Sequence, residues 1–183
     1  TTASTGLDVL AHALEGYWSI HHQPICDAAA LQAAKLVFTY LEKAYDHPDN
    51  IEAREKMCEA SLMAGIAFSH PKTAGSHACS YPLTNHYGLP HGEACAFTLD
   101  LFTEINNDAR LESLARYCGF LNTLAMTHEI RRLKKYMGMR TSLAEAGIKL
   151  EDLDKLVEAS MHPNMLNNPV KMNKEKLRAL YLR

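Results

Sequence analysis

The segment TGLDVLAHALEGY (residues 5–17) indicates the fold class of this 183-residue chain. Its apolar residues recur at intervals of three and four, the period of an amphipathic helix, at Leu7, Leu10, Ala11 and Leu14. We therefore expect a first helix from about Thr5, as its N-cap, into the region of Tyr17.

Most of the remaining sequence also predicts helix. Amphipathic or helix-forming segments cover roughly residues 27–45, 50–70, 93–106, 108–119, 127–137, 142–146, 150–160 and 174–182, with Asn50 and Asn173 as N-caps. A short strand through residues 36–38 is a weaker alternative, because helix formers flank it on both sides. The Gly- and Pro-punctuated stretch 71–92 is expected to be an irregular, functional loop. No strand-like alternation or repeat is present, so the sequence predicts one all-α multi-helix bundle over residues 1–183.

The composition is that of a single globular domain, with 47% hydrophobic and 22% charged residues. The formal net charge of -2 gives no electrostatic reason to expect nucleic acid or an anionic membrane as a partner. No apolar run approaches the ~20 residues that a membrane span needs. The five cysteines are odd in number and form no C-x-x-C pair, which favours reduced thiols and a cytoplasmic location.

Four residues suggest metal chemistry. Asp8 and His12 lie one helical turn apart on the same face, and His77 and His91 lie fourteen apart within the punctuated stretch. Three imidazoles and one carboxylate suit a divalent ion such as Fe2+ or Zn2+ with a position open for substrate. Spacing alone does not bring the two pairs together. It therefore leaves open a helical metallohydrolase, in which the ligands activate water, and a non-catalytic helical interaction domain.

Two stretches resemble the signatures of a known family. Residues 5–17 resemble the first signature of the group III, iron-containing alcohol dehydrogenases, and GSHA (75–78) with GLPHGEA (88–94) resembles the second. Asn168-Pro169 also resembles an Asn-Pro near the family's C-terminus. In that family an Asp and a His of the first signature and two His of the second hold the metal, and these positions correspond to Asp8, His12, His77 and His91. The resemblance implies the C-terminal helical domain of a dehydroquinate synthase-like fold.

The same resemblance implies an oxidoreductase that interconverts an alcohol and an aldehyde or ketone, with hydride passing to or from NAD or NADP. No Gly-x-Gly occurs, so a loop that cradles a dinucleotide pyrophosphate is absent from these residues. The family places that loop in an N-terminal nucleotide-binding domain. We therefore expect this chain to be a fragment that is inactive by itself, within a homo-oligomer that acts on a small alcohol or aldehyde and binds neither nucleic acid nor membrane.

One position departs from the family pattern. Many members carry a second His four residues after the first ligand of the second signature, where this chain has Tyr81. Tyr81 and His86 are the candidates for the catalytic proton relay, and the alternative is that Tyr81 only packs against the pocket wall. Residues 74–87 most closely resemble a branch associated with phosphonoacetaldehyde reduction. Lys72, Thr73 and Ser76 would offer a cation and hydroxyls to a phosphonate, unless Lys72 simply faces solvent.

The remaining polar residues carry weaker signals. The other histidines are expected at the surface, and Trp18 in the core. The basic run 131–135 (Arg-Arg-Leu-Lys-Lys) is expected to form a solvated helix face.

Overall fold

The computed structural model describes residues 1–183 and contains only helices. The helices are α1 (Thr2–Trp18), α2 (Pro24–Asp46), α3 (Ile51–Ser69), α4 (Gly75–Tyr87), α5 (His91–Ile105), α6 (Ala109–Tyr117), α7 (Thr123–Tyr136), α8 (Leu153–Ser160) and α9 (Lys174–Tyr181), with the short 3-10 helices η1 (Leu150–Asp152) and η2 (Pro163–Asn167). The predicted all-α class is confirmed, and the alternative strand at residues 36–38 is part of α2.

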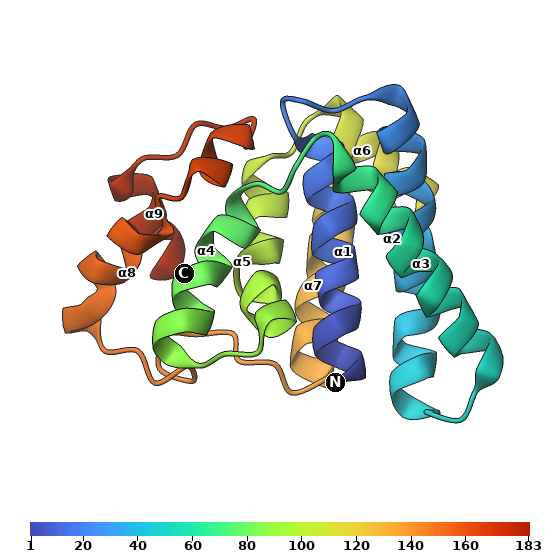
Figure 1. The fold of residues 1–183 in the computed structure, drawn as a ribbon, viewed down its shortest axis with the longest axis horizontal. Helices are drawn as coiled ribbons and strands as arrows, with labels where there is room; N and C mark the ends of the chain where they lie inside the picture. The colour runs from blue at the N-terminus through green and yellow to red at the C-terminus, as the bar shows by residue number, and fades with distance from the viewer.

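Helix α1 is the centre of the bundle. It packs against α2, α3 and α5, while α2 lies along α3 and α4 lies along α5 (Figure 1). The α8, α9 and η2 segments form a smaller group at the far side of α4. Most residues of α1 are buried, and Trp18 at its end is in the core as predicted. Its polar side chains Asp8 and His12 are only partly exposed, at 20% and 22%.

Side-chain caps explain where several helices begin. Asn50 and Asn173 each accept a hydrogen bond from the backbone amide three residues later, at 3.0 and 2.8 Å, which confirms both predicted N-caps. The predicted cap at Thr5 is wrong. Helix α1 already begins at Thr2, and the Thr5 hydroxyl donates back to the carbonyl of Thr1 at 3.2 Å.

The expected loop over residues 71–92 is the largest correction, because α4 fills most of it. Its glycines mark the ends of a helix: Gly75 opens α4, and Gly88 ends it with a φ of 69°, a left-handed conformation that glycine adopts without strain. Pro82 lies inside α4, at the cost of one backbone hydrogen bond. The short helix predicted at residues 142–146 is also wrong, since these residues form turns that end at Gly147, with a φ of 70°.

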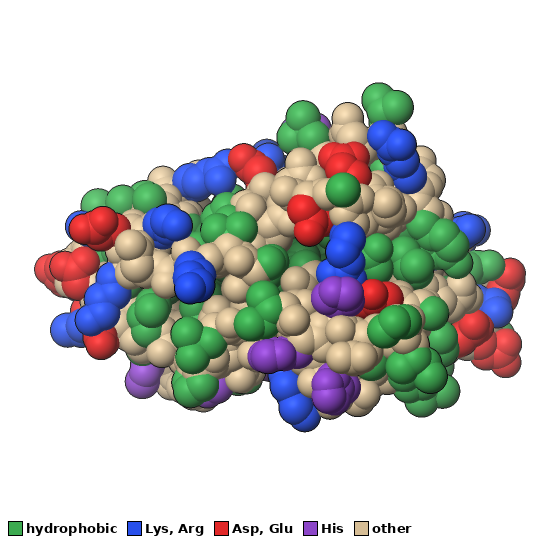
Figure 2. All heavy atoms as spheres, turned by 90° about the horizontal axis from the view of Figure 1, so that it is seen from above, with side chains coloured by type: hydrophobic (Ala, Val, Ile, Leu, Met, Phe, Trp, Pro, Cys, Tyr) green, Lys and Arg blue, Asp and Glu red, His purple; other side chains and the backbone are tan.

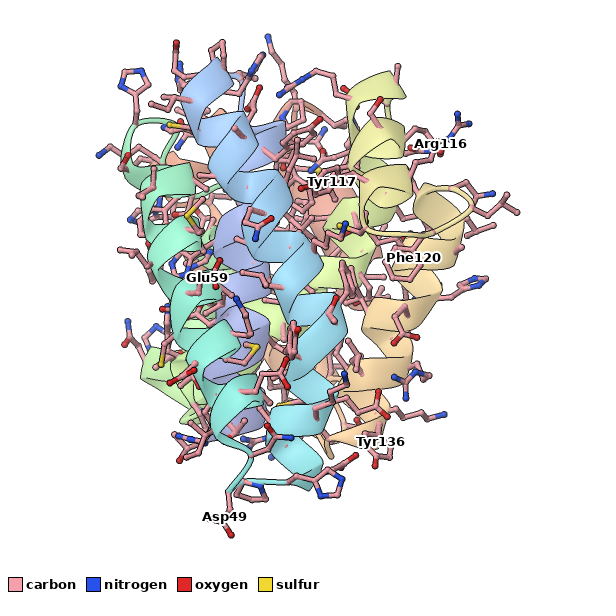
Figure 3. All side chains as sticks on the ribbon, turned by 90° about the vertical axis from the view of Figure 1, so that its right-hand side faces the viewer. Asp49, Glu59, Arg116, Tyr117, Phe120 and Tyr136 are labelled. Carbon is pink, nitrogen blue, oxygen red and sulfur yellow. The ribbon has the colours of Figure 1, made fainter.

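One edge of the bundle is held by aromatic contacts between α2 and the α6–α7 region. Figure 3 shows Tyr117, Phe120 and Tyr136 along this seam. Phe120 meets Phe38 of α2 edge-on, with ring centroids 4.8 Å apart, and the Tyr136 hydroxyl donates to Asp46 at 2.9 Å. These contacts bring α6 and α7 against the helical layer that supports α1.

The basic run of α7 is only partly the solvated face that was predicted: Arg132 and Lys135 are exposed, but Lys134 is not. Lys134 is buried, and its ammonium donates to Asp100 at 2.6 Å and to the carbonyl of Phe97 at 2.9 Å. Arg131 donates to the other oxygen of Asp100 and to Glu104, each at 2.7 Å. A charge inside a protein requires such partners. The partners here lie on α5, about 30 residues or more earlier in the sequence, so the basic run alone could not predict them.

The outer surface mixes side chains of all kinds. Figure 2, which views the bundle from above, shows histidines near the middle of the face and acidic and basic side chains intermingled at its left-hand end. No helix combines the length and the apolar character that crossing a membrane requires.

Replacing Gly16 with alanine tests the close approach of α1 and α3. The added Cβ would lie 2.6 Å from the carbonyl oxygen of Ala67, so backbone would have to move, and we expect the free energy of unfolding to fall by about 1–3 kcal/mol. The control is Gly65→Ala, whose Cβ would meet nothing within 4 Å and should raise the free energy of unfolding by about 0.5–1 kcal/mol. Urea denaturation measures both, and an unchanged Gly16→Ala protein would refute the tight contact.

Candidate metal centre

Three helices bring the candidate ligands to one place. Asp8 and His12 project from one face of α1, His77 lies in the first turn of α4, and His91 is the first residue of α5. Their convergence depends on α4 and α5 both packing against α1.

The distances show one cluster containing all four residues. His77 Nε2 lies 3.1 Å from His12 Nε2 and 3.4 Å from Asp8 Oδ1. His12 Nδ1 lies 3.7 Å from the same Asp8 oxygen, and the rings of His77 and His91 are 5.5 Å apart between centroids. The two pairs that spacing alone could not join are therefore side by side.

Glu15 is fully buried beneath the cluster and is a residue of the site that was not expected from the sequence. Its Oε1 accepts hydrogen bonds from the backbone amides of Ser76, at 2.6 Å, and His77, at 3.2 Å. Its Oε2 makes a short hydrogen bond with His77 Nδ1. Nδ1 therefore carries a proton that it donates to the carboxylate, and the opposite nitrogen of His77 faces the cluster. The available signal was a carboxylate three residues after His12 on the same face of an apolar helix.

The ionisation of the cluster follows from its burial and its charges. Burial acts to lower the pKa of His77, but the Glu15 carboxylate opposes this strongly and leaves that pKa raised. Burial and the neighbouring charge of His77 lower the pKa of His12 to about 4. Burial raises the pKa of Asp8, but the adjacent imidazoles outweigh it and leave that pKa lowered. Asp8 is therefore a carboxylate and His12 a neutral imidazole at neutral pH.

Two features show that a divalent cation fits these residues. Asp8 Oδ1 is buried without a hydrogen bond, which is costly for a charged oxygen. The Nε2 atoms of His12 and His77 face each other, so that at least one of their lone pairs needs a proton or a cation. Carboxylate and imidazole are common ligands of Fe(II) and Zn(II) in proteins.

Cys95, also missed from the sequence, adds a further donor. It lies one turn after His91 on α5, and its Sγ is 3.5 Å from His91 Nε2. The donor atoms of Asp8, His77, His91 and Cys95 all lie within 4.8 Å of one another. Burial raises the pKa of the Cys95 thiol to about 11.

The two proton-relay candidates lie in different surroundings. Tyr81 is one turn after His77 on α4, its hydroxyl accepts a hydrogen bond from Asn164 Nδ2 at 3.2 Å, and its ring packs on His162 with centroids 4.5 Å apart. His86 is exposed and lines a surface pocket with Asp152 and Lys155. The structure thus places Tyr81, but not His86, on the ligand-bearing part of α4.

The three residues considered for a phosphonate lie in different surroundings. Ser76 is fully buried, and the Thr73 hydroxyl accepts a hydrogen bond from Asn164 at 2.8 Å. Lys72 is exposed with a φ of 64°, and its ammonium donates to the carbonyl of Ser69 at 3.0 Å. Of the three residues, only Lys72 is exposed to solvent.

Comparison with known proteins gives consistent results. A family model described as "Fe-containing alcohol dehydrogenase family, C-terminal" matches residues 2–183. The structure of a sulfoacetaldehyde reductase from Bifidobacterium kashiwanohense in complex with NAD+ is 54% identical, with a TM-score of 0.95 over 99% of this chain and 49% of that one. An alcohol dehydrogenase from Oenococcus oeni is 33% identical, with a TM-score of 0.91 over 99% and 50% of the two chains. The 1,3-propanediol dehydrogenase of Citrobacter freundii is 34% identical over 98% of this chain and 50% of its own length. The chain thus spans about half the length of these relatives.

Glu15→Gln tests whether this carboxylate orients His77. An amide cannot accept from both the α4 backbone amides and His77 Nδ1, because one of its ends is a donor. We expect the affinity for Zn2+ to fall by about 10- to 100-fold, the usual effect of losing an outer-sphere partner, as measured by competition with a chromophoric chelator. The control is Glu112→Gln, which changes a carboxylate of α6 that accepts a hydrogen bond from the backbone amide of Thr123. A folded Glu15→Gln protein with parental affinity would exclude the orienting role.

Proposed function

This chain belongs to the iron-containing alcohol dehydrogenase family, and we propose that its protein interconverts an aldehyde and an alcohol with hydride transfer to or from NAD(P). The observation that carries the proposal is the convergence of Asp8, His12, His77 and His91 around a buried carboxylate oxygen that has no hydrogen bond. The relatives named above, matched over half their length, are alcohol dehydrogenases or an aldehyde reductase.

In this proposal the four residues hold Fe2+ or Zn2+, which supplies a Lewis acid for the oxygen of the substrate. Glu15 accepts the Nδ1 proton of His77, so that Nε2 is the ring nitrogen that would bond to the ion. The low pKa of His12 keeps its lone pair available at neutral pH. Because these residues contain no Gly-x-Gly loop, we assign most of the NAD(P) contacts to residues outside this chain.

Tyr81 is the proposed proton donor to the reacting oxygen. Its hydroxyl oxygen accepts from Asn164, which leaves the hydroxyl proton free to be donated elsewhere. It shares a face of α4 with His77, one turn away. His86, on the far part of α4, is the weaker candidate because it lies against α8.

The proposed substrate is a short aldehyde that carries a sulfonate or phosphonate. Two observations support it: the 54% identity to a sulfoacetaldehyde reductase and the resemblance of residues 74–87 to the phosphonoacetaldehyde branch. Both compounds pair an aldehyde with a tetrahedral anion. Lys72 is the exposed cation in the segment that leads into α4.

Two other functions remain distinguishable by experiment. A helical metallohydrolase would use the same ligands to activate water and would not oxidise NAD(P)H. A non-catalytic domain would show neither reaction. We also propose that the protein is a homo-oligomer, because α3 exposes Leu62 and Ile66 on successive turns; a monomer in sedimentation velocity would contradict this.

A kinetic comparison on the full-length protein tests the function and the substrate class. We expect NAD(P)H-dependent reduction of sulfoacetaldehyde or phosphonoacetaldehyde with kcat/KM about 10- to 100-fold above that for propanal, the value of one or two charge-assisted hydrogen bonds. Lys72→Ala should lower kcat/KM for the charged aldehyde alone, and Lys149→Ala, an exposed lysine elsewhere, should not. A preference for propanal would refute the anionic substrate, and no nicotinamide oxidation with any aldehyde would refute the dehydrogenase.

Tyr81→Phe separates proton donation from packing. The substitution keeps the ring against His162 and removes only the hydroxyl. We expect kcat to fall by about 100-fold, at the lower end of general acid catalysis, with little change in KM. Tyr87→Phe, near the end of the same helix, is the control. If Tyr81→Phe retains its kcat, the tyrosine only packs against the pocket.

A further inference from the structure

We propose that Cys95 is an additional ligand of the metal centre, whose thiolate bonds to Zn(II) or Co(II) alongside Asp8, His77 and His91. The proposal rests on the metal site of the proposed function and adds a donor that the sequence resemblance does not contain. When the bond forms, the thiol loses its proton to solvent and Sγ bonds to the ion, with no change of oxidation state.

Position on α5 makes Cys95 part of the cluster. It follows His91 by four residues, so both side chains leave the same face of one helix and move as a unit. The Sγ atom lies 3.5 Å from His91 Nε2, and the residue is fully buried. The thiol therefore points toward the ligand set and away from solvent.

The mutual distances are close to what a metal requires. With bonds of ~2.0–2.3 Å to nitrogen, oxygen and sulfur, the donors of a tetrahedral ion stand about 3.3–3.8 Å apart. The donor atoms of Asp8, His77, His91 and Cys95 already lie within 4.8 Å of one another. The largest of these distances exceeds that of a bound ion by about an ångström.

A second observation, independent of the cysteine, points to an ion among these same residues. Asp8 Oδ1 is buried and has no hydrogen-bond donor, although it lies 3.4 Å from His77 Nε2. His12, the sequence-predicted ligand outside this group of four, packs its ring on Phe68 with centroids 4.2 Å apart. The site thus offers five possible ligands. Asp8, His77 and His91 are common to the ligands predicted from the sequence and to the group that contains Cys95. Because thiolate is a soft ligand, Cys95 shifts the preference of the site toward zinc relative to Fe(II).

Cobalt spectroscopy on the full-length protein tests this directly. The protein is stripped of metal, loaded with one equivalent of Co(II), and its absorption spectrum recorded. We expect a sulfur-to-cobalt charge-transfer band in the near ultraviolet together with visible d–d bands. Cys95→Ser should lose the charge-transfer band and retain the d–d bands, because Asp8 and the histidines still hold the ion. Cys26→Ser, which changes a buried cysteine of α2, should keep both.

X-ray absorption of the zinc-loaded parent protein needs no substitution, so it decides the question even if Cys95→Ser fails to fold. One sulfur at ~2.3 Å beside nitrogen and oxygen at ~2.0–2.2 Å is the expected result. Bound zinc or cobalt with no sulfur in its shell would overturn the role of Cys95 and leave the metal site of the proposed function intact. Failure to bind zinc, cobalt or Fe(II) would overturn both.

Discussion

The buried carboxylate of Glu15 is the contact on which the rest of the site depends. No side chain of α4's own sequence caps that helix, and its first-turn amides at Ser76 and His77 donate instead to Glu15 of α1. A helix N-terminus carries unsatisfied amides and a partial positive charge, so an anion placed there is stabilised. The charge of Glu15, which would be costly in isolation inside the protein, is thus met by three donors. The same contact fixes where α4 begins and which nitrogen of His77 faces the centre.

The approach of α5 to α1 imposes a second constraint. At Gly92, next to His91, an added Cβ would lie 2.1 Å from the carbonyl oxygen of Ser4 and 3.0 Å from Asp8 Cβ. At Gly75, at the start of α4, it would lie 2.3 Å from the ring of Phe102 on α5. A candidate ligand lies close to each glycine: His91 directly precedes Gly92, and His77 is two residues after Gly75. Helices that carry ligands must come closer here than side chains of ordinary size allow.

These constraints explain which parts of the structure could be predicted from the sequence. The 3.6-residue period predicted the long helices, and Asn50 and Asn173 predicted two of their starts, because both signals are local. The loop predicted at residues 71–92 was wrong because glycine and proline are common in loops, whereas here they mark the first residue, the interior and the end of α4. The burial of Lys134 was not predicted, because its partner Asp100 lies on another helix. The spacing of Asp8 and His12 follows from one helix, but Glu15 and Cys95 acquire their roles only from packing between helices.

The ionisation of the cluster connects its folding with its chemistry. Burial acts to lower the pKa of His77, but the carboxylate of Glu15 raises it, and His77 Nε2 faces His12 Nε2 at 3.1 Å and Asp8 Oδ1 at 3.4 Å. The negative charges that favour a proton on His77 also favour a divalent cation beside it. His12 stays neutral because burial and the neighbouring charge of His77 both lower its pKa, which leaves its lone pair unprotonated. A buried carboxylate that caps a neighbouring helix therefore also orients His77 toward Asp8 and His12, the other residues expected to hold a cation.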